Sequence, residues 1–439
     1  MRAFLKRHCY AVAVLSLGAL TMIKILTFLL LFKAGQIQPY VGGSGMSYYL
    51  PAASSILTAG AFYVAPDKTR SSKVAPGYPA LLALVQWVAP RSYLALAVCL
   101  QMICDWVVAM LLLLIGRRQT SVEDGWVAGM AWLLFPPATV ISTWIASEAL
   151  FTCLLVSSMA LFMRALSPKA PVALSLIAGV VLGFATLVRG VPQLFPVFLL
   201  GVFVTGFFWY QSAMRHWLKA ALCLLLGMSV VVLPWTVRNF RVLGEPVVVQ
   251  TGIGGVFLMG SRSEYFTING FGQRYTTLER QAAADGLPKP TDGKQTSDDR
   301  WQFKLGLREY RLRLSTEPWS LPLLLLHKVV RCWYGSETGD VSTQLMLGLC
   351  SLATVPAGLF QLWRWRKTRL IISLLWGSLI LYFVLLALVN LPMFRYALPL
   401  YPFLIFAASH WYMEIFRHRR SLLHRILNPR EDEYARSSL

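Results

Sequence analysis

Long apolar runs dominate the chain, and short polar stretches separate them. A helix needs about 20 apolar residues to cross a bilayer, and hydropathy predicts ten such helices at 10–33, 92–115, 125–144, 147–166, 172–188, 192–211, 218–236, 342–362, 370–390 and 396–414. Because ten is an even number, both ends of the chain are expected on one side of the membrane. The stretch 318–333 is apolar but short, so we expect it to lie in the interface, with an eleventh span as the alternative.

The positions of Lys and Arg predict the orientation of these helices. The N-terminus, the loops 116–124, 164–171, 212–219 and 363–369, and the tail from Glu414 together hold 19 Lys and Arg residues, whereas the short loops opposite hold only Arg189 and Arg395. Loops rich in Lys and Arg stay in the cytoplasm. Both termini are therefore expected there, and the long segments 34–91 and 237–341 are expected to face outward.

This pattern divides the chain into four parts. We predict an N-terminal transmembrane module, 1–236, that includes the first outer loop, 34–91. An outer segment with an interfacial helix follows at 237–341, then C-terminal transmembrane helices at 342–414 and a basic cytoplasmic tail at 415–439. The fold class is therefore an all-α polytopic membrane protein with two long outward-facing segments.

Composition excludes a soluble protein. Of the 439 residues, 56% are hydrophobic and only 14% are charged, and the mean hydropathy is +0.56. The net charge of +21 would suit nucleic acid, but the cations cluster in loops beside the membrane, so the bilayer is the expected partner and nucleic acid is not. The seven cysteines form no C-x-x-C pair, which argues against a disulfide scaffold or a zinc site.

The first outer loop is polar enough to be functional. Its glycine-rich turn at 42–45 precedes Tyr48 and Tyr49, and Asp67 and Lys73 follow in a stretch with several other cations. Gly, Pro and charged residues cannot cross lipid without partners. We predict a surface that rests on the headgroups and binds an anion, with a plain surface loop carrying interfacial aromatics as the alternative.

Two further patterns predict local structure. Lys24 and Asp105 lie near the middle of the first two apolar runs, and we expect them to form an intramembrane pair. In the outer segment, Val247 to Val249 and Val256 to Leu258 suggest short strands, and 298–316 suggests a charged amphipathic helix.

Candidate chemistry gathers at the outward ends of the helices. No Walker loop, H-E-x-x-H or G-x-S-x-G pattern is present. Polar residues at these ends are Lys73, Glu148, Arg189, Arg238 with Asn239, and Arg395 with Tyr396. Basic residues above apolar helices suit a lipid phosphate. For each arginine alone, capping or snorkelling at a helix end is the alternative, and Glu148 can simply complement a helix dipole.

Several short motifs follow one another in a distinctive order along the chain. They are Tyr49-Leu50-x-x-Ala53, Pro76-Gly77-Tyr78-Pro79, Ser147-Glu148-x-Leu150-Phe151, Gly183-x-x-x-Leu187-x-Arg189, Pro234-Trp235-x-x-Arg238-Asn239 and Arg395-Tyr396-x-x-Pro399. Their order resembles that of the bacterial GT-C glycosyltransferases, in particular the lipid A aminoarabinose transferases and protein O-mannosyltransferases. The likeness spans most of the chain, and it implies a GT-C-like bundle of about 10–11 transmembrane helices in the bacterial cytoplasmic (inner) membrane.

The resemblance implies an inverting glycosyltransferase that builds cell envelope glycans. Such an enzyme moves a sugar from a polyprenyl-phosphate donor to a glycan, lipid or protein acceptor on the outer face. Lys73, Arg189, Arg238 and Arg395 are then the candidates for the donor phosphate, and Tyr49, Tyr78, Asn239 and Tyr396 are candidates for other substrate contacts.

The chain departs from the family pattern at its expected first-loop acid. That position is Gly45, and the only acid in the loop is Asp67. Asp67 and Glu148 are therefore the candidate catalytic acids, and a divalent metal ion stays open as a cofactor. The alternatives are a lipid-linked sugar binder or translocator of the same fold that lost catalysis, and a polysaccharide polymerase of unrelated fold.

Overall fold

The computed structural model describes residues 2–42, 48–63, 72–207, 211–262, 279–284, 286–336 and 339–427. Its longer helices are α1 (Arg2–Lys33), α4 (Tyr93–Gln119), α7 (Glu148–Ala165), α8 (Ala173–Val188), α10 (Gln211–Leu243), α13 (Gln295–Thr316), α15 (Val341–Trp365), α16 (Leu370–Val389) and α18 (Tyr401–Leu427). The shorter ones are α2 (Leu50–Ala59), α3 (Gly77–Val88), α5 (Val122–Leu133), α6 (Pro136–Ile141), η2 (Val191–Leu194), α9 (Phe195–Phe207), α11 (Ile253–Gly260), α14 (Ser320–Arg331), α17 (Phe394–Ala397) and η4 (Leu398–Leu400).

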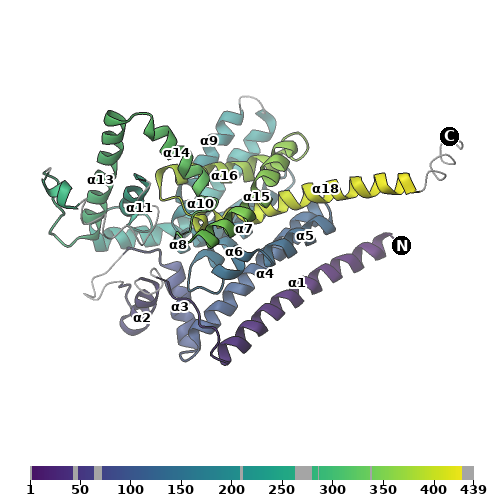
Figure 1. The fold of residues 1–439 in the computed structure, drawn as a ribbon, viewed down its shortest axis with the longest axis horizontal. Coiled ribbons are helices and arrows are strands. Elements are labelled where there is room, and N and C mark those ends of the chain that lie inside the picture. Colours follow the sequence, from purple (N-terminus) through teal and green to yellow (C-terminus); the bar gives the residue numbers. More distant parts are fainter. Residues whose placement is uncertain are drawn as a thin grey trace.

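The protein is an all-α polytopic membrane protein, as the apolar runs predict. Within the described ranges, six helices are long and apolar enough to cross a membrane: Cys9–Lys33, Tyr93–Gln119, Glu148–Ala165, Arg215–Leu243, Val341–Trp365 and Leu370–Val389. Figure 1 shows α1 and α18 extending to one end of the molecule and α2, α11 and α13 lying at the other. We call the end where α7 begins the site end, and the end where α7 finishes the basic end.

One predicted span is interrupted. The stretch 125–144 forms two short helices, α5 and α6, separated at Phe135. Pro136 and Pro137 start α6, and a proline has no N–H to continue the helical ladder. The carbonyl of Leu133 therefore lacks the donor that residue 137 would supply in a continuous helix.

The predicted Lys24–Asp105 pair is present only as an electrostatic interaction between the two charges, because the described residues show no direct ion pair between them. Lys24 Nζ instead donates to the Leu133 carbonyl oxygen at 3.0 Å and to Thr139 Oγ1 at 3.1 Å. The lysine thus satisfies the carbonyl that the prolines leave open, while Asp105 lies buried in α4. Sequence spacing placed both charges at similar depth but could not show this local partner.

Glycines bring α8 and α10 into backbone contact. A Cβ built on Gly179 would lie 2.2 Å from the carbonyl oxygen of Leu224, and one on Gly227 would lie 2.2 Å from that of Leu176. Gly183 meets the same helix, since its Cβ would lie 2.7 Å from Val231 Cβ. Small residues with three residues between them, as in Gly179 and Gly183, allow membrane helices to approach this closely. The contact fixes α8, which ends one residue before Arg189.

Neither strand expected in the outer segment forms, since Val247 to Val249 are irregular and Val256 to Leu258 are helical. Gly254 and Val256 to Leu258 belong to α11, and no strand occurs in the described parts of the chain beyond an isolated bridge of Tyr40 with Trp144. Asp299 of α13 explains the helix, because its carboxylate accepts from the backbone N–H groups of Gly252 at 2.9 Å and Gly254 at 2.8 Å. This bond caps the first turn of α11 from a distant helix. The predicted amphipathic helix is present as α13.

The short helix α14 buries a lysine. Its 12 residues span only about 18 Å, which is too short to cross a bilayer, so the interfacial placement is favoured over an eleventh span. Lys328 is fully buried and donates to the Tyr310 hydroxyl at 3.1 Å and the Leu388 carbonyl at 2.5 Å. Burial lowers the pKa of Lys328 to about 7.

This lysine predicts a pH dependence of stability. The unfolded chain binds a proton at Lys328 up to the ordinary lysine pKa, whereas the folded protein loses it near pH 7, so stability is expected to rise from about pH 7 to 10. Its contribution is at most about 1.4 kcal/mol per pH unit. Thermal unfolding of Lys328→Met should show a flatter pH profile than wild type, with exposed Lys304→Met as control. If stability rose equally with pH in wild type and in Lys328→Met, Lys328 would not be the source of the pH dependence.

Candidate functional site

Glu148 is the centre of a charged cluster at the site end. It is the first residue of α7, and its side chain is only 5% exposed. Arg189, directly after α8, places Nη1 2.8 Å from Glu148 Oε1, and Arg395 of α17 places Nε 3.9 Å from the same oxygen. Two cations on one buried carboxylate leave the cluster with a net charge of +1, which suits an anionic ligand.

Tyr396 contacts both arginines of this cluster. The guanidinium carbon of Arg189 lies 5.0 Å from the centre of the Tyr396 ring, and that of Arg395 lies 5.3 Å from it. Cation–π contacts of this length restrict the guanidinium groups. The ring therefore holds two flexible cations in fixed places beside Glu148.

Tyr49, directly before α2, and Tyr78 of α3 border the cluster. The Tyr49 hydroxyl lies 3.3 Å from Ser147 Oγ, and the rings of Tyr49 and Tyr78 meet edge to face at 5.1 Å. Burial raises the pKa of the Tyr49 hydroxyl, and the nearby Glu148 carboxylate raises it further. Tyr49 therefore keeps its proton at neutral pH and can donate a hydrogen bond to a substrate.

Gln101 is a supporting residue that sequence reasoning missed. It lies buried in α4, accepts from the Tyr78 hydroxyl at 3.0 Å, and donates to the carbonyl oxygens of Ser142 at 2.9 Å and Trp144 at 2.7 Å. It thereby ties Tyr78 to the loop that leads into α7. A polar amide inside an apolar run is the signal that could have identified it.

Arg238 and Asn239 form a second cluster with the first outer loop. Arg238 donates to Ser72 Oγ at 3.0 Å, Asn239 Oδ1 at 3.1 Å and the Phe62 carbonyl at 3.3 Å. Its guanidinium also lies 4.6 Å from the ring centre of Trp235. Asn239 is fully buried and donates to the carbonyl oxygens of Val247 and Val249. These contacts indicate a structural role for Asn239.

The two clusters are neighbours along the first outer loop. Lys73 follows Ser72 of the second cluster and lies 5.2 Å from the ring centre of Tyr48, and Tyr49 of the first cluster is the next residue. The structure thus brings Glu148, Arg189, Arg395 and Tyr396 into one cluster, with Tyr49 and Tyr78 at its border. It places Lys73, Arg238 and Asn239 in the adjoining one. Asp67 and Gly45 lie outside the described residues.

The described residues offer no group of three or more His, Cys, Asp and Glu side chains that could hold a metal ion. Glu148 is engaged with two arginines. A divalent metal cofactor therefore stays a prediction from the family resemblance.

Comparison with solved structures shows the fold. The chain is similar to the oligosaccharyltransferase AglB from Archaeoglobus fulgidus, solved in complex with an inhibitory peptide and a dolichol-phosphate, with a TM-score of 0.57 and 14% identity over 94% of this chain and 51% of that one. The apo form of the Archaeoglobus fulgidus enzyme gives a TM-score of 0.57 at 12% identity, covering 94% of this chain and 52% of that one. The chain thus spans about half the length of these structures.

A more distant likeness is to ArnT from Cupriavidus metallidurans bound to undecaprenyl phosphate, with a TM-score of 0.42 and 14% identity over 91% of this chain and 77% of that one. No protein-family model matches the chain, and no curated protein matches it. The comparisons thus show that the chain shares the fold of the Archaeoglobus fulgidus oligosaccharyltransferase, in agreement with the all-α membrane bundle that the motif order implied.

Proposed function

We propose that the protein is a membrane glycosyltransferase that moves a sugar from a polyprenyl-phosphate donor to an acceptor at the site end of the bundle. The observation that carries the proposal is the convergence of Arg189 and Arg395 on buried Glu148. The fold of a lipid-linked-sugar transferase supports it. So does the orientation that the basic loops predict, which puts this cluster on the outer face of the membrane.

The two arginines bind the donor phosphate in this proposal. In an inverting transfer, the acceptor's oxygen or nitrogen attacks the anomeric carbon while the bond from that carbon to the phosphate oxygen breaks. The polyprenyl phosphate leaves with the bonding electron pair and gains negative charge, which Arg189 and Arg395 stabilise. Arginine offers a planar fork that matches phosphate oxygens.

Glu148 positions these arginines rather than acting on the acceptor. Its carboxylate contacts both guanidinium groups, and the ring of Tyr396 contacts them as well. We assign the acceptor proton to Asp67, because it is the only acid in the segment 34–91. Lys73 and Arg238, in the adjoining cluster, contribute positive charge near the same substrate.

A second candidate is a lipid-linked sugar binder or translocator without catalysis. The occupation of Glu148 by two cations favours it, as does Gly45 at the place of the family's acid. It predicts that wild-type protein binds the lipid-linked sugar and never transfers it.

The assignment of roles is tested with purified protein, a labelled polyprenyl-phosphate sugar and membrane acceptors. Glu148→Gln is expected to weaken donor binding by about tenfold, because Arg189 and Arg395 lose the carboxylate that holds them in place. Asp67→Asn is expected to lower turnover and to leave donor binding unchanged. Exposed Glu317→Gln, in the outer segment, is the matched control. Loss of turnover in Glu148→Gln with unchanged donor binding would instead make Glu148 the base.

A further inference from the structure

A groove opens between helices at the basic end, opposite the site end. It has a volume of about 810 Å³, and it is lined by the last turns of α4 and α7, by Trp217 of α10 and by the first turn of α16. Apolar side chains such as Leu111, Ala160 and Ile371 form its wall. The size and apolar lining are those of a ligand site.

Arginines from three separate parts of the chain line this groove. They are Arg118 near the end of α4, Arg164 near the end of α7 and Arg369 just before α16. None of these three forms an ion pair with an acid in the described part of the chain. Arg369 is held by its own contacts, since Nε donates to the Gln119 carbonyl at 2.8 Å and the guanidinium lies 5.3 Å from the Trp365 ring centre.

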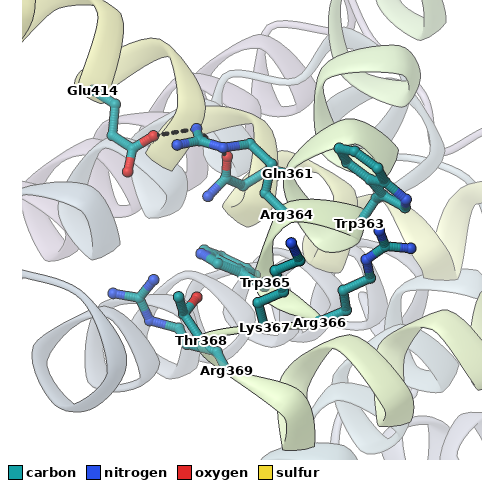
Figure 2. A pocket seen from close by; sticks show the side chains of 9 residues that line it. All are labelled: Gln361, Trp363, Arg364, Trp365, Arg366, Lys367, Thr368, Arg369 and Glu414. Atoms are coloured by element: carbon teal, nitrogen blue, oxygen red, sulfur yellow. Dashed lines mark hydrogen bonds and ion pairs between the residues drawn. The ribbon is translucent and has the colours of Figure 1, made fainter.

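A second, more polar hollow adjoins the groove. Its volume is about 550 Å³, and Thr368 and Arg369 line both cavities. Figure 2 shows the basic side chains of Arg364, Arg366, Lys367 and Arg369 around it. Among the described residues that line this hollow, Glu414 is the only acid, and it pairs with Arg364. The positive charge beside the groove is therefore largely uncompensated.

The position of the groove matches the depth of a lipid headgroup. Glu148 and Arg164 lie near opposite ends of α7, whose 18 residues span about 27 Å, close to the hydrocarbon thickness of a bilayer. The three arginines thus stand at the membrane boundary away from the sugar-transfer cluster. Basic pockets between transmembrane helices are suited to anionic lipid headgroups.

We propose that this groove is a binding site for an anionic glycerophospholipid of the surrounding leaflet. The phosphate lies against Arg369 between Arg118 and Arg164, and an acyl chain follows the apolar wall past Ala160. A zwitterionic headgroup such as that of phosphatidylcholine carries the same phosphate but adds a cation that the arginines repel, and a soluble phosphate fails to use the groove. The site is separate from the Glu148 cluster and does not depend on the function proposed there.

Native mass spectrometry of delipidated full-length protein tests the proposal. Phosphatidylglycerol and phosphatidylcholine with identical acyl chains are titrated against wild type and two triple variants. The groove variant is Arg118→Gln, Arg164→Gln and Arg369→Gln. The control variant, Arg215→Gln, Lys169→Gln and Lys219→Gln, removes the same charge at the same end from side chains that do not line the groove.

Phosphatidylglycerol is expected to bind wild type at least about tenfold more tightly than phosphatidylcholine, and the groove variant is expected to lose that preference, because three charge-assisted contacts disappear. The control variant should retain it within about twofold, a difference too small for a lost contact. Ala160→Trp, which fills the groove and keeps every charge, should weaken binding of both lipids. Equal loss in the groove and control variants, or equal binding of the two lipids to wild type, would overturn the site. Tighter binding of undecaprenyl phosphate than of phosphatidylglycerol, lost in the groove variant, would also overturn the phospholipid assignment.

Discussion

Arg189→Ala is expected to lower sugar transfer by about 100-fold or more, because removal of one preorganised donor from a developing anion has costs of that size. The change also leaves the buried Glu148 carboxylate without its 2.8 Å partner. The variant should therefore lose a contact with the phosphate, and Arg395 should no longer be held in its place beside Glu148. Initial rates with a labelled polyprenyl-phosphate sugar measure the effect.

A matched variant separates this effect from a general loss of positive charge. Arg91 is exposed in the loop between α3 and α4, at the same end of the bundle. Arg91→Ala should keep transfer within about twofold of wild type, as is usual for exposed positions away from the chemistry. Arg189→Lys restores charge without the planar fork and should recover only part of the rate. Full activity in Arg189→Ala would remove the proposed role of this residue.

Gly179→Val is expected to prevent correct packing of the membrane bundle. Its first side-chain carbon would lie 2.2 Å from the Leu224 carbonyl oxygen, so α8 must move away from α10. Overpacking costs about 1–3 kcal/mol even when side chains can yield, and here the obstacle is backbone. We expect a large loss of monodisperse protein after purification, which size-exclusion chromatography and thermal unfolding measure.

Gly201→Val is the control for this glycine. Gly201 lies in α9, and a Cβ built on it meets nothing within 4 Å, so the variant should fold as wild type does. Any folded Gly179→Val protein should also transfer sugar poorly, because a shift of α8 displaces Arg189, and misplacement by about 1 Å can cost about 100-fold in rate. Normal folding of Gly179→Val would contradict the close contact of α8 with α10.

Hydropathy predicted helical structure because lipid leaves the backbone no other partner, but only six of the ten predicted spans match described helices that are long and apolar enough to cross a membrane. Every backbone donor and acceptor in the bilayer core must be paired within the chain, so an apolar run of sufficient length becomes a helix. The break at Pro136 and Pro137 is the exception within 125–144, and its consequence for Lys24 depends on a carbonyl three residues earlier. Periodicity cannot show which distant side chain fills such a gap.

The sequence predicted which residues gather at the candidate site, but it did not predict which of these residues contact one another. Alternating topology places Glu148, Arg189 and Arg395 at one end of the bundle, and the structure joins them. The assignment of Arg238 to a separate cluster follows from Ser72 and the Phe62 carbonyl, which belong to an irregular loop. The capping of α11 by Asp299 could not be predicted either, because a contact between segments about 45 residues apart leaves no local signal in the sequence.

The most direct test of the central claim is the equilibrium binding of undecaprenyl phosphate to Arg189→Ala with Arg395→Ala, compared with wild type and Arg91→Ala. Saturating phosphatidylglycerol is kept present throughout, so that the groove at the basic end is occupied. The account predicts affinity reduced by at least about 30-fold in the double variant, the combined effect of two lost charge-assisted contacts, and unchanged affinity in Arg91→Ala. Equal affinity of the double variant and wild type would contradict it.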